Sequence, residues 1–211
     1  MNYTYDYTHK FKYYYWGPCL TRFILSDEII DGLLQRGDKL KEDARKGLAG
    51  HLNKELKYTQ EDQNWFLSEF SPVISDHMKF LGEYHNKDFI NNVNVDLIDL
   101  WINYMQKNEF QPHHVHNQQL SFVIYLQVPE KLKEEHKNYI GSDSAGPGGI
   151  KFINDWNADI LNIAEVPIFP KKNECYIFPG SLVHTVYPFQ SDCERVSVSG
   201  NFKFVHPDEQ V

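Results

Sequence analysis

Three histidines lie within one short segment, Gln111-Pro112-His113-His114-Val115-His116. In an extended strand, side chains two residues apart point to the same side, so we expect His114 and His116 to face one way and His113 the other. Two neutral imidazoles on one side of a strand can hold a single metal ion. Such a pair also occurs as structural or solvated histidines, so the pattern needs support from elsewhere in the chain.

A fourth histidine and an arginine provide that support. His184 follows a Pro-Gly turn, and Arg195 comes eleven residues later in a strand-like segment. The two-residue period of a strand puts Arg195, Ser197, Ser199 and Asn201 on one face. A buried arginine needs an anion, because an unpaired buried charge costs several kcal/mol, and its planar fork suits a carboxylate. Ser197 can add a hydrogen bond to the same anion, although an internal acid or solvent could also satisfy the arginine.

The elements that must position these residues change in character near Asn94. Before it, apolar residues recur at three- and four-residue steps, which is typical of helices. We expect one helix capped by Ser26 and a second that begins after Thr59 with a capping box. Ser71 and Pro72 look like the cap and first residue of a third helix. These helices are expected to pack on one face of a sheet.

After Asn94 the chain is rich in short apolar segments separated by turns, which predicts the strands of a sandwich or jelly roll. The expected strands cover residues 95–105, 120–128, 150–153, 174–178, 182–186 and 195–205. The polar stretch 131–147 is expected to be an excursion between strands. The tyrosine-rich residues 3–15 are expected to form an aromatic edge strand that covers the core, or alternatively a surface for a substrate or partner.

Length and composition limit the remaining choices. The 211 residues suffice for one domain, so we expect a single unit over 1–211, with helical support over about 1–93 and a β core over 94–206. A net charge of −8 without a basic stripe argues against nucleic acid as the main partner. Three scattered cysteines, no signal-like start and no long apolar run indicate a cytoplasmic protein that does not bind a membrane.

Several segments together resemble the 2-oxoglutarate/Fe(II) oxygenases, especially a small bacterial and marine-phage group with an H-x-H motif. The similarity covers about residues 95–205, with a weaker echo at 48–52. It implies an α+β, mainly β fold: a double-stranded β-helix (jelly roll, cupin-like) with the N-terminal helices packed on the sheet. The resemblance is carried by Glu109–His116, Leu120–Leu126, Phe178-Pro179, His184, Arg195 and Asn201.

The resemblance also implies the roles of individual residues and the cofactors Fe(II), 2-oxoglutarate and O2. His114, His116 and His184 correspond to metal ligands. Arg195 corresponds to the residue that binds the 5-carboxylate of 2-oxoglutarate, with Ser197 beside it. Tyr125 lies where such enzymes often place a tyrosine against the cosubstrate. Ser121 and Asn201 are weaker candidates for the same pocket.

One ligand departs from the wider superfamily, in which the usual motif is H-x-D. His116 occupies the third position, as it does in the smaller group. His116 either binds the metal as a neutral imidazole or lies just outside the ligand sphere with water completing it. His113 is the alternative ligand, and otherwise borders the substrate.

The reaction implied is oxidative decarboxylation of 2-oxoglutarate to succinate and CO2, coupled to hydroxylation of a small molecule or protein side chain. One alternative is a non-catalytic cupin-like protein that binds a metal or small ligand, which would not need Arg195 and Ser197. A second is a Zn or Mn cupin enzyme with a glutamate ligand, for which Glu109 is poorly placed. A third is a structural protein, which leaves the clustering of histidines unexplained.

Overall fold

The computed structural model describes residues 17–85, 93–141, 144–155 and 163–205. The tyrosine-rich segment predicted as an edge strand therefore lies outside the described residues. Within the described residues, none of the helices combines the length and apolar character needed to cross a membrane.

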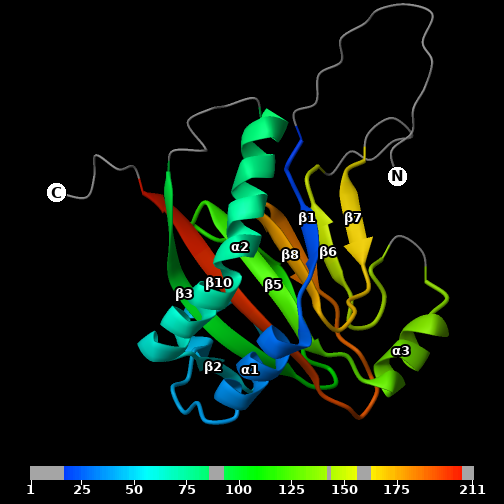
Figure 1. Ribbon diagram of the computed structural model, residues 1–211. Helices are drawn as coiled ribbons and strands as arrows, with labels where there is room; N and C mark the ends of the chain where they lie inside the picture. Colours follow the sequence, from blue (N-terminus) through cyan, green and yellow to red (C-terminus); the bar gives the residue numbers. More distant parts are fainter. Residues whose placement is uncertain (1–16, 86–92, 142–143, 156–162, 206–211) are drawn as a thin grey trace, which may run out of the picture.

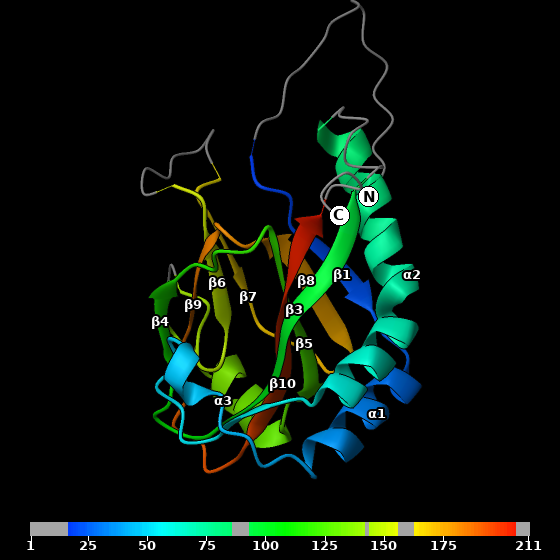
Figure 2. The ribbon, with the colours of Figure 1, turned by 90° about the vertical axis from the view of Figure 1, so that its left-hand side faces the viewer.

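Two antiparallel sheets face each other (Figure 2). The larger has the strand order β1-β8-β5-β10-β3-β2, and the smaller has the order β4-β9-β6-β7. This arrangement confirms the predicted double-stranded β-helix. The strands are β1 (Thr21–Ile24), β2 (Glu55–Lys57), β3 (Asn94–Met105), β4 (Gln111–His114), β5 (Leu120–Gln127), β6 (Ile150–Ile153), β7 (Glu165–Ile168), β8 (Glu174–Pro179), β9 (Val183–Val186) and β10 (Arg195–Val205).

The central strand β5 is apolar over most of its length because both of its faces are covered. Leu120 and Ile124 belong to the core formed with the helices. Val123 and Tyr125 belong to a second core shared with residues of the smaller sheet. The continuous apolar run that predicts this strand therefore reflects two cores, one on each side of the larger sheet.

Helices α1 (Asp27–Gly37) and α2 (Gln60–His85) cover the outer face of the larger sheet (Figure 1). Aromatic rings join α2 to the sheet: the ring centroids of Phe66 and Phe70 lie 5.5 and 5.4 Å from that of Phe122 on β5. Phe202 on β10 stacks in the same group, 5.2 Å from Phe122. The helices are thus a scaffold on the outer face of the sheet, and the inner face is left for the barrel interior.

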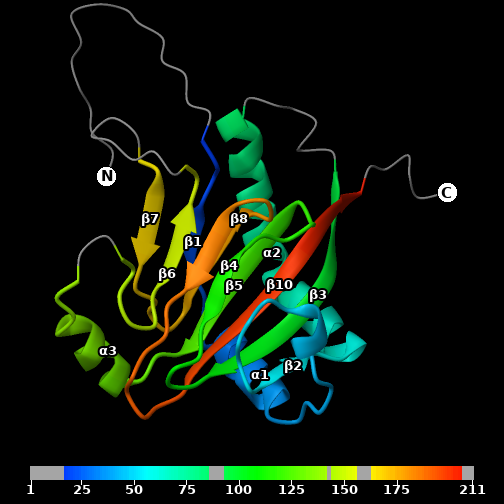
Figure 3. The same cartoon turned by 180° about the vertical axis from the view of Figure 1, so that it is seen from behind.

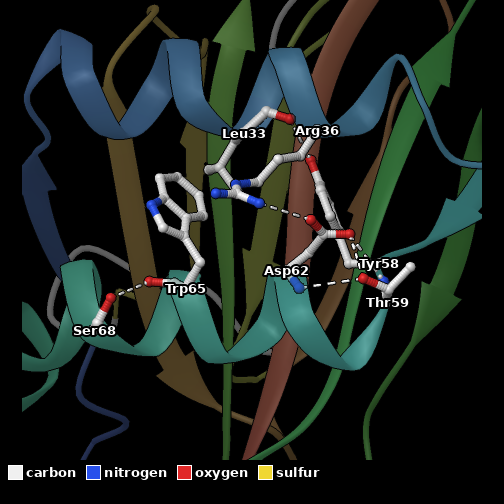
Figure 4. Close-up of polar contacts among 7 residues, drawn as sticks. All are labelled: Leu33, Arg36, Tyr58, Thr59, Asp62, Trp65 and Ser68. Atoms are coloured by element: carbon white, nitrogen blue, oxygen red, sulfur yellow. Dashed lines mark hydrogen bonds and ion pairs between the residues drawn. The ribbon is translucent and has the colours of Figure 1, made fainter.

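The start of α2 carries the predicted capping box (Figure 4). The Thr59 hydroxyl accepts a hydrogen bond from the Asp62 amide at 3.2 Å, and the Asp62 carboxylate accepts from the Thr59 amide, also at 3.2 Å. Asp62 also pairs with Arg36 of α1 at 3.0 Å, which ties the two helices together. One carboxylate therefore both caps α2 and fixes its approach to α1.

The predicted break at Ser71-Pro72 is wrong, since α2 runs through Pro72 without interruption. Proline lacks the amide that would bond the Ser68 carbonyl, but the Ser71 hydroxyl donates to that carbonyl at 3.4 Å. The buried stripe of Phe66, Phe70 and Ile74 continues across the proline and outweighs its helix-breaking effect.

The simple division into helices before Asn94 and strands after it is also incomplete. The first part contains the short strands β1 and β2, one at each edge of the larger sheet. The polar stretch 131–147 begins with a helix, α3 (Glu130–Lys137), whose Leu132 is fully buried. Strand β7 was not predicted; Figure 3 shows it at the edge of the smaller sheet, beside β6. Short edge strands carry too few residues to establish a period, which explains these misses.

The capping box gives a stability prediction. The substitution Asp62→Ala removes both the cap and the pair with Arg36, so we expect the free energy of unfolding to fall by about 1–2 kcal/mol. Glu61→Ala, at an exposed position in the same turn, should lower it by at most about 0.5 kcal/mol. Urea denaturation measures both, and equal losses would show that the cap contributes nothing specific.

Candidate metal and cosubstrate site

The pairing of β4 with β9 brings the predicted metal-binding histidines together. His114 and His184 are direct cross-strand partners, and their ring centroids lie 4.1 Å apart. His116 follows β4, with its ring centroid 5.2 Å from each of the other two. Their ligand atoms all lie within 4.8 Å of one another, and these three side chains form the one such group found among the described residues.

Backbone carbonyls fix two of the imidazoles. The Nδ1 of His114 lies 2.8 Å from the Pro112 carbonyl, and the Nδ1 of His184 lies 2.9 Å from the Leu182 carbonyl. Since a carbonyl oxygen can only accept, Nδ1 carries the proton in both rings. The lone pair is then on Nε2, which is how metal-binding histidines are usually oriented.

Burial keeps the three rings neutral. Desolvation lowers the pKa of His116 to about 4 and that of His184 to about 3, and it also lowers the pKa of His114. The positive charge of a neighbouring protonated ring opposes protonation in each case. Neutral imidazole is the form that binds a metal, so the site needs no proton release at neutral pH.

The loop that carries His116 is held against Gly180 by backbone contacts. The His116 amide donates to the Gly180 carbonyl at 2.8 Å, and the Gly180 amide donates to the Gln119 carbonyl at 3.0 Å. A Cβ atom at position 180 would lie 2.1 Å from the Gln118 carbonyl oxygen, too close for any side chain. This close approach sets the position of His116 relative to β9.

Arg195 lies on the opposite sheet, on β10, and is only 2 % exposed. One guanidinium nitrogen donates to the Gly148 carbonyl at 2.7 Å, whereas Nε has no hydrogen-bond partner. No ion pair between described residues includes Arg195. Its guanidinium carbon lies 5.5 Å from the ring centre of Tyr125, whose hydroxyl is also buried and unpartnered. Burial raises the pKa of Tyr125 to about 12, so the hydroxyl is a donor. The internal acid considered as a partner of Arg195 is thus absent among the described residues.

These groups share one cavity of about 140 Å³ between the two sheets. The three histidines line it from the smaller sheet, and Arg195, Ser197 and Tyr125 line it from the larger one. The predicted metal ligands and three of the predicted cosubstrate residues, Arg195, Ser197 and Tyr125, therefore meet in one cavity. A second cavity of about 440 Å³ opens beside the first and shares Trp101, Val115 and His116 with it.

Other candidate residues lie elsewhere. The Ser121 hydroxyl donates to the Asn201 side chain at 2.7 Å; Asn201 lines only the larger cavity, and Ser121 lines neither. His113 is exposed and outside the histidine cluster. Glu109 is also outside it, since its carboxylate accepts from Asn53 and from the Gln106 amide.

Sequence reasoning missed Glu55, which lines the same cavity from β2. Glu55 is fully buried, and neither carboxylate oxygen has a hydrogen-bond partner. Burial is the largest effect on its pKa, which is raised to about 7. The Gln111 amide opposes this rise without making a hydrogen bond of good geometry. A three-residue strand in a polar region gives no periodic signal by which the residue could have been found.

Comparison with known proteins agrees with this geometry. Residues 99–201 match the family of putative 2OG-Fe(II) oxygenases. No curated protein matches the sequence. The span of the family match contains every residue assigned above to the histidine cluster and to the Arg195 side of the cavity.

Solved structures share the fold at low sequence identity. A 2OG-Fe(II) oxygenase family protein from Burkholderia pseudomallei is 12% identical, with a TM-score of 0.55 over 82% of this chain and 77% of its own. A Pseudomonas putida prolyl-4-hydroxylase is 15% identical, with a TM-score of 0.53 over 89% and 92%. A viral collagen prolyl hydroxylase from Paramecium bursaria Chlorella virus-1 is 14% identical, with a TM-score of 0.52 over 87% and 94%. The segment that holds the histidine cluster, residues 99–201, is therefore similar in sequence to the 2OG-Fe(II) oxygenase family, and the chain shares its fold with these solved structures.

Proposed function

We propose that the protein is an Fe(II)- and 2-oxoglutarate-dependent dioxygenase that hydroxylates its substrate and releases succinate and CO2. The observation that carries this proposal is the shared cavity. It combines three neutral imidazoles on one side with a buried, unpaired guanidinium on the other. A bound metal alone would account for the three imidazoles, whereas only a bound anion would account for the unpaired guanidinium.

The donor set fits a divalent iron ion. His114, His116 and His184 would hold it through ring nitrogens, leaving other coordination positions for 2-oxoglutarate and O2. His116 takes the place of the usual carboxylate, so the metal site carries one more unit of positive charge than the H-x-D sites of the superfamily. His113 is too exposed to compete for this role.

The opposite wall fits the far carboxylate of 2-oxoglutarate. Arg195 supplies a fixed positive charge, and its unpartnered Nε points to a missing acceptor. The Tyr125 hydroxyl is a second buried donor without a partner, and Ser197 pairs with Tyr125 across β10 and β5. A carboxylate placed here would satisfy both unpaired groups, which otherwise cost about 1–3 kcal/mol each. Ser121 and Asn201 would act only indirectly, since they bond each other.

The chain's own task is to orient the bound groups and to exclude water. When bound, iron with 2-oxoglutarate and O2 supplies the oxidising chemistry, with succinate and CO2 as the coproducts. Phe178 and Val186 line the cavity beside the histidines and give it an apolar wall. The larger cavity beside His116 offers the substrate a path to the metal. A non-catalytic cupin-like binding protein would share the histidines but would not need the side of the cavity that Arg195 lines.

The metal role is tested by spectroscopy. Anaerobic addition of Fe(II) and 2-oxoglutarate should give the weak visible charge-transfer band of the chelate. His184→Ala should abolish this band, because it removes one of three nitrogen ligands. His113→Ala, which changes an exposed histidine next to the cluster, should leave it intact. A band of normal intensity in the His184 variant would exclude the proposed ligand set.

The cosubstrate role is tested by binding. Arg195→Ala should weaken 2-oxoglutarate binding by about 2–5 kcal/mol, because the carboxylate loses its buried partner. Tyr125→Phe, which removes a single neutral donor, should cost about 0.5–1.5 kcal/mol. Titration of the metal-loaded protein measures both, and unchanged affinity in the arginine variant would contradict the assignment.

A further inference from the structure

The cavity that holds the histidines contains an acid for which the proposed reaction has no use. Three glutamates are buried among the described residues: Glu55, Glu109 and Glu174. The Glu109 carboxylate is satisfied by Asn53 and Gln106, and that of Glu174 by Tyr176 and the Lys171 amide. Glu55 alone of the three has neither oxygen hydrogen-bonded, and it alone lines the cavity.

The sheet register places Glu55 at the end of a polar row on the inner face. Glu55 pairs with Asn103, Asn103 pairs with Ser197, and Ser197 pairs with Tyr125 across β2, β3, β10 and β5. All four side chains are at most 2 % exposed. Arg195 lies on β10, two strands from β2, or about 10 Å at the usual strand spacing. The cavity therefore has a cation on one side and an acid on the other.

This separation decides which ligand each side can take. A dicarboxylate is drawn to Arg195 and repelled by Glu55, so Glu55 remains for another molecule. An unpaired buried carboxylate costs several kcal/mol, and a positively charged N–H donor offsets this cost best. The indole of Trp101, which lies two residues before Asn103 and on the same face, adds an aromatic surface suited to a cation.

We propose that the Glu55 carboxylate is the acceptor for a protonated nitrogen of the substrate, so that the oxygenase acts on a compound carrying an amine or guanidinium group. This inference rests on the proposed function, because it assigns the substrate to the cavity that the cosubstrate shares. The cationic group enters the small cavity together with the carbon that reacts. The rest of the substrate lies in the larger cavity beside His116.

Gly50 lies beside this acid. A Cβ atom at position 50 would lie 3.0 Å from one carboxylate oxygen of Glu55 and 3.3 Å from the other. The residues around Gly50 also line the cavity. The substitution Gly50→Ala therefore keeps the charge of Glu55 but crowds the position of a bound cation.

The binding test uses small probes that differ in charge but not in shape. The protein is loaded with 2-oxoglutarate and with Zn(II), which replaces iron without redox chemistry. It is then titrated with guanidinium or with neutral urea, and binding is followed by NMR. We expect guanidinium to bind at least tenfold more tightly than urea in the wild type. The preference should fall below twofold in Glu55→Gln and should weaken in Gly50→Ala. Glu69→Gln removes an exposed carboxylate on α2, outside both cavities, and should leave the preference unchanged.

Two outcomes would overturn the proposal: equal binding of guanidinium and urea to the wild type, or the same preference in the Glu55 variant. Uptake of 2-oxoglutarate is measured first in the same samples. If the cosubstrate fails to bind, the proposed function fails; if it binds without a cation preference, only the assignment of Glu55 fails.

A stability measurement checks that Glu55 is unpaired without using a ligand. Its pKa is raised from 4.5 to about 7, mainly by burial. The Gln111 side chain and the charge of Arg45 lower this pKa, and the charges of Glu109 and Asp43 raise it. An acid with a raised folded pKa loses stability as the pH rises above its unfolded value, until the pH passes the folded value. Between pH 5 and 8 the folding equilibrium constant of the metal-free wild type should fall roughly a hundredfold relative to Glu55→Gln. Parallel pH profiles would show that the carboxylate is already satisfied.

Discussion

The pairing of β4 with β9 is the constraint on which the site depends. It sets His114 directly opposite His184, although the two lie 70 positions apart in the sequence, with β5, α3, β6, β7 and β8 between them. A slip of one residue would turn one of the two rings to the other face of the sheet. The proposed metal site is therefore a property of strand register in the smaller sheet, and the helices contribute only by supporting the larger one.

The two sheets supply different chemical groups to the cavity. The smaller sheet supplies neutral nitrogen donors, and the larger sheet supplies charge, with Arg195 near its middle and Glu55 on its edge strand. The outer face of the larger sheet is packed against α1 and α2, so only its inner face is free to carry polar side chains. Strand β10 shows this division: Val196 and Val198 face the helices, while Arg195 and Ser197 face the cavity.

Sequence reasoning succeeded where residues were many and periodic, or where they matched a known family. The fold, the long strands and the capped start of α2 followed from period and capping chemistry. The H-x-H pair and the distant His184 were found, and the structure gathers them in one cluster. The Ser71-Pro72 break failed because local helix-breaking signals were outweighed by packing against the sheet. Ser121 was predicted only as a weaker candidate, and the sheet register pairs it with Asn201, whose side chain its hydroxyl bonds.

What the sequence could not show depends on burial and on missing partners. A glutamate in a three-residue edge strand looks like any surface acid in the sequence. The structure shows that Glu55 is buried without a hydrogen-bond partner, whereas the carboxylate of the buried Glu109 accepts a hydrogen bond from Asn53. The cytoplasmic location and the single-domain organisation remain predictions from composition and length.

Gly180 has a consequence for how the protein tolerates genetic change. Because its backbone touches the loop that carries His116, the position of one proposed metal ligand is encoded by the absence of a side chain. Even an alanine there would push the loop away while the two cores remain intact. The result would then be a folded protein with a displaced His116, so on the proposed function selection at this position acts on metal binding more than on the fold.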